Sequence, residues 1–264
     1  MTKQERPHNH NPHNHNPSHD HRRIISVVLP VYKNKDSLLN LRERLTTTLN
    51  RAKIQHELVF VQDACPLDSV LVLEKNPPPD REQDIKIIRL PQNRGQHQAL
   101  IKGLATANGN YFVTMDADLQ DRPEDLPRLY NEITSRNVAC VFAGRTGTYQ
   151  QSSRHLTSRV FKALHSTIIG VPQNAGAFLI VNKLLRDFIV KAAPHVEKPH
   201  IVSLIGVSRL PTISIPIERD IREKGVSAYS GWGRLKLGVR SILTAVSLRR
   251  QGRKLRELYL KTKE

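Results

Sequence analysis

Two aspartates, Asp116 and Asp118, stand directly after the apolar and β-branched run of residues 111–115, and Gln120 follows at the same spacing. Such a run predicts a buried strand, and in an open α/β sheet ligands bind just beyond the carboxyl ends of the strands. Two carboxylates and an amide oxygen suit a hard divalent cation that shares its remaining positions with substrate phosphates. An Asp-x-Asp tripeptide is also common at polar strand ends, so the rest of the chain must decide between these interpretations.

Three further predicted strands end in residues that could bind a nucleotide. The strand at residues 24–32 ends at Pro30 and Tyr32, the strand at 57–61 runs into Asp63, and the strand at 85–90 leads to Gly95. Asp63 can accept hydrogen bonds from a base or a ribose hydroxyl, Tyr32 can pack against the base, and Gly95 allows the backbone to approach phosphate closely. Because parallel strands end at one sheet edge, we expect these residues and the two aspartates to line one nucleotide and metal pocket.

The elements that must position these residues alternate between strands and helices. An amphipathic helix with Asp36 as its expected N-cap follows the first strand, and a second helix follows Gly95. This alternation with short connections predicts an α/β fold in which helices flank a mainly parallel, doubly wound central sheet. The second half of the chain is less regular, with strands expected at residues 138–143, 177–181 and 212–217.

The 264 residues can hold one large α/β domain or two small ones. Lys and Arg outnumber Asp and Glu by 41 to 24, which gives a formal charge of +17 and indicates anionic partners. Aromatic residues make up only 5% of the chain, which argues against stacking on single-stranded nucleic acid, so no specific nucleic-acid partner is expected. The two cysteines have no metal-type spacing and favour a reducing compartment, and no secretory signal or membrane-spanning run is visible, so a cytoplasmic location is expected.

The two ends of the chain differ from its middle. Residues 1–22 repeat Pro-His-Asn-His-Asn and predict a disordered tail, which either scavenges transition metals or has no specific role. Residues 231–264 are strongly basic and predicted to be helical, with Glu257 and Glu264 as their only acids. This segment fits either a solvated helix face or an interfacial helix on an anionic leaflet, which would place the protein peripherally on the cytoplasmic membrane face.

Two common nucleotide-binding motifs are missing. The chain has no Gly-x-Gly-x-x-Gly segment, which argues against dinucleotide oxidoreductases, and no Gly-x-x-x-x-Gly-Lys-Ser/Thr segment, which argues against P-loop NTPases.

Four segments carry a resemblance to a known family. They are Ser-Val-Val-Leu-Pro-Val-Tyr at residues 26–32, Asp-Ala-Cys-Pro at 63–66, Asn-Arg-Gly-Gln-His at 93–97 and Met-Asp-Ala-Asp-Leu-Gln-Asp-Arg-Pro-Glu at 115–124. Together they resemble family 2 glycosyltransferases of the GT-A fold, and most of all the dolichol- and polyprenyl-phosphate sugar transferases, over residues 23–245. The resemblance implies a GT-A domain at residues 23–230. Some relatives continue into membrane helices, whereas this chain is expected to lack them and to continue into the basic segment at 231–264.

The resemblance also implies a role for each matching position. In this family a Mg²⁺ or Mn²⁺ ion bridges the donor diphosphate, and the matching metal positions here are Asp116, Asp118 and Gln120. Arg145 and Arg154 match positions that face a phosphate, and Arg222 and Ser227 lie in a segment that closes over the site. The implied catalytic residues are Asp118, Arg145 and Arg222, and the implied donor-binding residues are Pro30, Tyr32, Asp63, Gly95, Asp116, Arg154 and Ser227.

Departures from the family pattern fall in the nucleoside pocket. Asn34 stands where an acid is frequent, and Ala64 and Cys65 replace the usual Gly and Ser after Asp63.

The resemblance implies an inverting transfer from a nucleotide-diphosphate sugar. An acceptor oxygen attacks the anomeric carbon while the nucleoside diphosphate leaves. A hydroxyl acceptor needs a general base, whereas an ionised lipid phosphate does not. Glu197 is the only acid between residues 190 and 210, which favours a polyprenyl phosphate as acceptor. Two alternatives stay open: a soluble family 2 enzyme that acts on a hydroxyl, and a non-catalytic basic binding protein.

Overall fold

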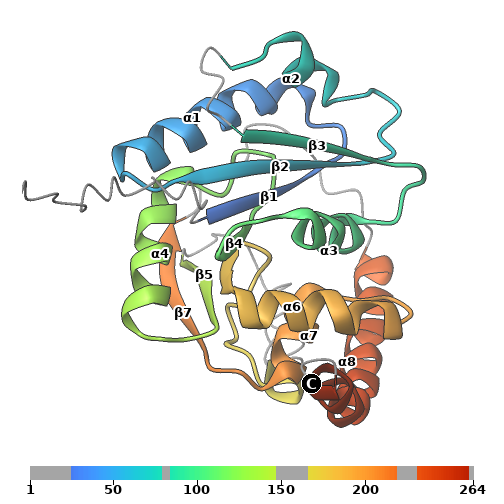
Figure 1. Cartoon of the computed structure of the whole chain (residues 1–264). Coiled ribbons are helices and arrows are strands. Elements are labelled where there is room, and N and C mark those ends of the chain that lie inside the picture. The colour runs from blue at the N-terminus through green and yellow to red at the C-terminus, as the bar shows by residue number, and fades with distance from the viewer. Residues whose placement is uncertain (1–24, 79–83, 147–165, 219–230, 262–264) are drawn as a thin grey trace, which may run out of the picture.

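The computed structural model describes residues 25–78, 84–146, 166–218 and 231–261 (Figure 1). The expected tail at residues 1–22 lies outside these ranges. Within them, seven strands form one sheet in the order β3-β2-β1-β4-β6-β5-β7. The strands are β1 (Ile25–Val31), β2 (His56–Asp63), β3 (Asp84–Leu90), β4 (Tyr111–Thr114), β5 (Cys140–Thr146), β6 (Leu179–Asn182) and β7 (Thr212–Glu218).

Strand direction confirms the expected α/β fold with a mainly parallel sheet. β1 pairs in parallel with both β2 and β4, with Val27 opposite Leu58 on one side and Val113 on the other. β3 is parallel to β2, and β7 is parallel to β5. β6 reverses direction and runs antiparallel to both β4 and β5. The carboxyl ends of β1 to β5 therefore lie at one edge of the sheet.

Helices cover both faces of the sheet because its central strands are apolar on both sides. All residues of β1 are buried except Pro30, which is partly buried, as expected for a parallel strand between two helical layers. Apolar residues of α1 (Leu38–Arg51) and α4 (Leu126–Ser135) join the core on one face, and α2 (Leu71–Lys75) adds Leu73 to it. The other core contains residues of α3 (Gln96–Thr106), α6 (Lys183–Ala192), α7 (Ile201–Ser208) and α8 (Gly231–Lys261).

The start of α1 differs from the sequence prediction. A short 3-10 turn, η1 (Lys35–Ser37), precedes the helix and contains Asp36, so Asp36 is not the N-cap. Two similar turns, η2 (Pro123–Asp125) and η3 (Ala193–His195), lie before α4 and after α6. The hydroxyl of Ser37 bonds instead to the main-chain oxygen of Asn34 at 2.9 Å and to that of Ala117 at 2.6 Å.

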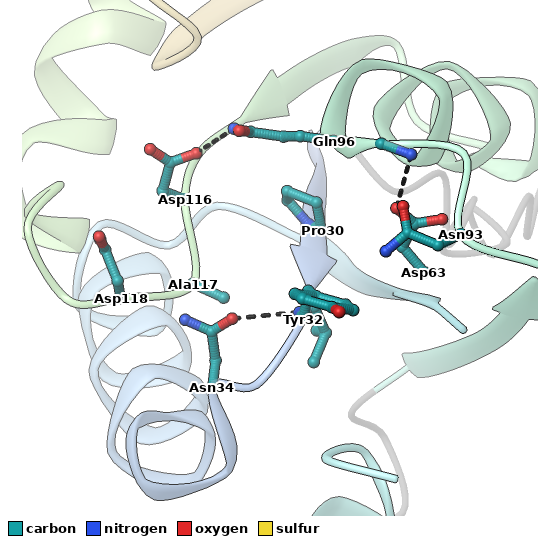
Figure 2. Close-up of a pocket in the computed structure, with 11 residues that line it drawn as sticks. Pro30, Tyr32, Asn34, Asp63, Asn93, Gln96, Asp116, Ala117 and Asp118 are labelled. Atoms are coloured by element: carbon teal, nitrogen blue, oxygen red, sulfur yellow. Dashed lines mark hydrogen bonds between the residues drawn. The ribbon is translucent and has the colours of Figure 1, made fainter. Parts of the chain in front are cut away.

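A glycine brings α3 close to the sheet. A Cβ atom at Gly103 would lie 2.3 Å from Cγ1 of Val28 and 2.9 Å from Cγ2 of Val61. Because no side chain separates helix from strands at this point, α3 packs directly on β1 and β2. Its first residue, Gln96, thereby lies at the sheet edge where Asp116 follows β4 (Figure 2).

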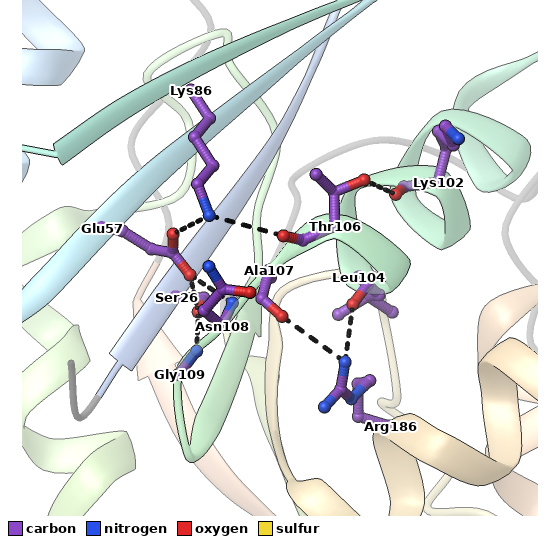
Figure 3. Close-up of polar contacts among 10 residues, drawn as sticks. All are labelled: Ser26, Glu57, Lys86, Lys102, Leu104, Thr106, Ala107, Asn108, Gly109 and Arg186. Carbon is purple, nitrogen blue, oxygen red and sulfur yellow. Dashed lines mark hydrogen bonds and ion pairs between the residues drawn. The ribbon is translucent and has the colours of Figure 1, made fainter. Parts of the chain in front are cut away.

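A buried carboxylate joins several elements at the opposite edge of the sheet (Figure 3). Glu57 is fully buried and accepts hydrogen bonds from the Ser26 hydroxyl at 2.6 Å and from the Asn108 main chain at 2.5 Å. The Lys86 ammonium lies 2.7 Å from its other oxygen. Burial alone would raise the pKa of Glu57, but the bonds from Lys86, Ser26 and Asn108 lower it below its usual value. The network therefore holds β1, β2, β3 and the α3–β4 connection together around an ionised group.

Arg186 of α6 secures the other end of the same connection. Its guanidinium donates to the main-chain oxygens of Leu104 at 3.3 Å and Ala107 at 3.5 Å, and it lies 4.4 Å from the centre of the Phe112 ring. A cation at the carboxyl end of a helix is favourable because the last carbonyl groups lack helical partners. Arg186 thus fixes the carboxyl end of α3, while Gly103 fixes its middle.

Candidate functional site

One cavity of about 390 Å³ lies at the carboxyl edge of the sheet, within the size range of small-molecule sites (Figure 2). Its lining comes from the ends of β1 and β2 and from the segments that follow β3 and β4. The lining residues are Pro30, Val31, Tyr32, Asn34, Asp63, Asn93, Gly95, Gln96, Asp116, Ala117 and Asp118. The structure therefore brings together six of the residues predicted from sequence, namely Pro30, Tyr32, Asp63, Gly95, Asp116 and Asp118.

The turn after β1 presents an aromatic side chain to the cavity. Tyr32 is 43% exposed, and its main-chain N–H donates to the side-chain oxygen of Asn34 at 3.1 Å. Lys33 adopts a positive φ of 61° and places its ammonium 5.3 Å from the centre of the Tyr32 ring. Ser37 links this turn to Ala117, which lies between the two aspartates. Ser37 thus links the turn that carries Tyr32 to the segment that carries the two aspartates.

Asp63 holds the segment that enters α3. The main-chain N–H of Arg94 donates to one of its carboxylate oxygens and that of Gly95 to the other, each at 2.7 Å. Gly95 has a φ of +86°, a conformation that glycine adopts without strain, and it directly precedes α3. A carboxylate offers about four acceptor positions, so these two bonds leave it capacity for a ligand. Sequence reasoning assigned Asp63 a ligand role and missed this structural one.

The two aspartates after β4 are held by different partners. The Gln96 side-chain N–H donates to a carboxylate oxygen of Asp116 at 2.5 Å, and the Asp116 main chain donates to the buried Asp121 at 3.2 Å. The Asp118 carboxylate accepts the main-chain N–H of Gln120 at 3.2 Å. Leu119, between Asp118 and Gln120, has a φ of +63°. This value is strained for a leucine, and the tight turn imposes it.

The donor set fits a divalent cation that also binds a ligand. Asp116 and Asp118 both line the cavity, and carboxylate oxygens are the ligands that Mg²⁺ and Mn²⁺ prefer. Among the described residues no group of three or more His, Cys, Asp or Glu side chains could hold a metal. A cation here would therefore complete its coordination with phosphate or water, the usual arrangement for Mg²⁺ with nucleotides. Gln120, predicted as the third ligand, is not among the lining residues. Its main-chain N–H, rather than its side chain, donates to Asp118.

The structure describes the remaining predicted residues only in part or not at all. Arg154, Arg222 and Ser227 fall outside the described residues. For Arg145 only the main chain is described: it pairs with Ile217 of β7 near the end of β5. Because β5 runs in the same direction as β4, this position lies at the edge of the sheet that carries the cavity.

Two titratable residues lie beside the cavity without lining it. The ring of His97 packs 4.0 Å from that of His200, and burial lowers the His97 pKa to about 4, which keeps the imidazole neutral. Burial would raise the pKa of Cys65, but hydrogen bonds from Ser69 and from the Lys33 main chain lower it overall. His97 therefore packs against the residue that precedes α7 rather than lining the cavity.

Sequence reasoning missed two amides that line the cavity, Gln96 and Asn93, and assigned no role to Asn34. Gln96 could have been found, because it is the first residue after a glycine that ends a strand-to-helix turn. At that place a side chain of the first helical turn faces the sheet edge.

Solved glycosyltransferases share this fold. Glucosyl-3-phosphoglycerate synthase from Mycobacterium tuberculosis, in complex with Mn²⁺, UDP-glucose and phosphoglyceric acid, superposes with a TM-score of 0.59 at 18% identity, covering 86% of this chain and 79% of its own. The mannosyltransferase PcManGT from Pyrobaculum calidifontis, in complex with GDP-mannose and Mn²⁺, gives 0.59 at 14% identity over 91% and 74% of the two chains. The expectation of a GT-A fold is therefore confirmed.

The family is shown by sequence. The profile of Glycosyl transferase family 2 matches residues 26–182, which is more than half of the chain, and the protein belongs to this family. Similar proteins include undecaprenyl-phosphate 4-deoxy-4-formamido-L-arabinose transferases from Sodalis glossinidius, 30% identical over 208 residues, and from Proteus mirabilis, 32% identical over 209 residues. Each match covers 78% of this chain but only 63% of the relative's own length.

In the described part of the chain, none of the helices is both long and apolar enough to traverse a bilayer.

Proposed function

We propose that the protein is an inverting glycosyltransferase that moves a sugar from a nucleotide-diphosphate sugar to a polyprenyl phosphate with Mg²⁺ or Mn²⁺. The observation that carries the proposal is that Asp116 and Asp118 line the same cavity as Tyr32 and Asp63. Its two ends suit the two ends of a nucleotide diphosphate, a base at the aromatic side and phosphates at the acidic side. The relatives from Sodalis glossinidius and Proteus mirabilis, both named as transferases to undecaprenyl phosphate, support the choice of acceptor.

Each residue of the donor site has a proposed role. Asp116 and Asp118 hold the cation, with Gln120 retained as a candidate ligand, and Tyr32 packs against the base beside Pro30. Asp63 accepts a hydrogen bond from the nucleoside while it holds the Gly95 turn. The bound cation would supply a Lewis acid that neutralises charge on the departing diphosphate. Arg154 and Ser227 are proposed to contact the donor as well.

The proposed transfer needs no general base for the acceptor. A lipid phosphate is already ionised at neutral pH, so its oxygen can attack the anomeric carbon without losing a proton. We assign Arg145 and Arg222 to stabilise the negative charge that grows on the leaving group, because such interactions strengthen as the reaction proceeds. The alternative, a hydroxyl acceptor, would share the whole donor side but would need a carboxylate base.

Contact with a membrane surface is proposed through α8. Among the side chains described for it, residues 245–261, the exposed cations are Arg249, Arg250, Arg253, Lys254 and Lys261, and Glu257 is the only acid in the sequence of α8. Each cation near an anionic leaflet contributes about 1 kcal/mol of attraction, which salt screens. Cosedimentation with phosphatidylglycerol vesicles that disappears with phosphatidylcholine vesicles or at high salt supports a peripheral position on the cytoplasmic face. Equal cosedimentation with both kinds of vesicle contradicts it.

The function is tested by transfer of radiolabelled sugar. Purified protein is incubated with a panel of nucleotide sugars, polyprenyl phosphate and Mn²⁺ or Mg²⁺, and labelled lipid is extracted. We expect labelled lipid with the wild type and with Asp36→Asn, whose exposed carboxylate at the same sheet edge does not line the cavity. Asp118→Asn should lower the rate at least 100-fold.

Three results would count against this function. Transfer to a soluble hydroxyl with none to lipid refutes the acceptor assignment. Full metal-dependent activity in Asp118→Asn refutes the site. Salt-sensitive binding of polyanions, with no response to any nucleotide sugar, favours a non-catalytic binding protein instead.

A further inference from the structure

Gln96 occupies a position that two other interactions determine. It is the first residue of α3, and the two main-chain N–H groups just before it are both held by Asp63 at 2.7 Å. The absence of a side chain at Gly103 lets the same helix pack closely on β1 and β2. The backbone of Gln96 is therefore fixed relative to the ends of three strands before its side chain makes any contact.

The side chain of Gln96 reaches Asp116 across the cavity (Figure 2). Its amide N–H lies 2.5 Å from a carboxylate oxygen of Asp116, although the Gln96 side chain as a whole is exposed to solvent. The bond is charge-assisted, because the amide donates to a carboxylate, and such bonds are stronger than those between neutral groups. The contact therefore favours one orientation of the Asp116 carboxylate.

The chemistry of the amide suits a carboxylate that must bind a cation. An amide N–H orients an oxygen of Asp116 but carries no charge, so it leaves the negative charge of the aspartate available. A lysine or arginine in the same place would neutralise the carboxylate. Partners of this kind, which bind a metal ligand rather than the metal, are known to control both ligand orientation and metal affinity.

We propose that Gln96 is a positioning residue that presents Asp116 to the divalent cation. The inference rests on the proposed function only in taking Asp116 as a cation ligand. It also gives Asp63 a second effect, because the bonds from Asp63 to Arg94 and Gly95 set the place from which Gln96 reaches Asp116. The base end and the cation end of the donor cavity are thereby joined through the first turn of α3.

The test measures cation binding without any reaction. Mn²⁺ is titrated into the full-length protein with no nucleotide sugar present, and free Mn²⁺ is followed by its electron paramagnetic resonance signal. Gln96→Met keeps the length of the side chain but has no N–H donor, and we expect it to bind Mn²⁺ about 10-fold more weakly than the wild type. The matched control is Gln98→Ala, on the same helix turn but not in the cavity lining, which should bind as the wild type does.

The outcomes separate this inference from the function. Thermal unfolding without metal should be the same for Gln96→Met and the wild type, because the exposed side chain adds little to the core. Unchanged Mn²⁺ affinity in Gln96→Met, an equal loss in Gln98→Ala, or no Mn²⁺ binding by the wild type would each overturn the proposal. Weaker Mn²⁺ binding by Gln96→Met in a protein that transfers no sugar would uphold Gln96 and reject the glycosyltransferase function.

A second variant tests the link to β2. Asp63→Asn replaces one carboxylate oxygen by an NH₂ group that must face a main-chain N–H, so the turn at Gly95 is disturbed. We expect weaker Mn²⁺ binding although Asp63 is not a cation ligand. Unchanged affinity would refute the connection through α3.

Discussion

The ion pair between Lys86 and Glu57 allows a quantitative test of the fold. In Lys86→Met the fully buried carboxylate loses the Lys86 ammonium and keeps the Ser26 hydroxyl and the Asn108 N–H as donors. Removing one partner of a buried pair costs about 3–5 kcal/mol. Because Lys86 is 25% exposed and two donors remain, we expect a loss of about 2–3 kcal/mol in the free energy of unfolding at pH 7.5.

The pH dependence of this loss identifies its cause. In the wild type the pKa of Glu57 is lowered, so the ion pair stabilises the protein above the unfolded pKa of about 4.3 and is lost as the pH falls through the lower folded pKa. We expect a higher pKa for Glu57 in Lys86→Met, because burial, which raises the pKa, is then opposed by fewer partners. Protonation then relieves the buried charge, so the deficit relative to the wild type should be smaller at pH 5 than at pH 7.5.

Urea unfolding followed by far-ultraviolet circular dichroism measures this deficit at both pH values. Lys102→Met removes an exposed lysine from α3 and serves as the control, with an expected change within about 0.5 kcal/mol. Adding Glu57→Gln to Lys86→Met should recover part of the stability at pH 7.5, since no charge is then buried. A deficit that stays constant on acidification, or a loss as small as that of the control, would refute the argument.

Three further predictions concern packing, the partly buried His97 and the thiols. Gly103→Ala should lower the free energy of unfolding by about 1–2 kcal/mol, because overpacking against Val28 outweighs the better helix propensity of alanine; greater stability in urea would show that α3 can move outward freely. The folded His97 pKa of about 4 lies below the unfolded value of about 6.5, so wild-type stability should fall as the pH drops from 6.5 to 4. In urea titrations at pH 7 and 4.5, His97→Leu should lose less stability on acidification, and an equal loss would contradict a partly buried, neutral ring. Iodoacetamide should modify Cys65, which is 7% exposed and has a lowered pKa, before the fully buried Cys140; mass spectrometry of the native protein that finds Cys140 modified first would exclude this burial.

The strands and the location of the site could be predicted because both follow from local composition. An apolar run that stops at a polar residue indicates a strand and its end, and four such ends predicted the cavity that contains Asp63 and Asp116. The direction of β6 could not be predicted in this way. Its four residues read as a buried strand in either orientation, and only pairing with β4 and β5 decides between them.

The polar contacts within the site were less predictable than its location. Asp36 fits an N-cap by residue type, but the 3-10 turn shifts the helix start to Leu38. Asp63 is a plausible ligand by type, and its bonds to Arg94 and Gly95 depend on residues about 30 positions away. Such contacts arise only after the sheet has brought distant segments together. The roles of Arg154, Arg222 and Ser227 stay predictions, since they lie outside the described residues.

The cavity draws its described lining from one continuous part of the chain, between Pro30 and Asp118. The reversed strand β6 and the later elements β5, β7, α6 and α7 complete the sheet and its cover without adding to that lining. Substitutions in those later elements can therefore alter the cover of the sheet without changing any described residue of that lining.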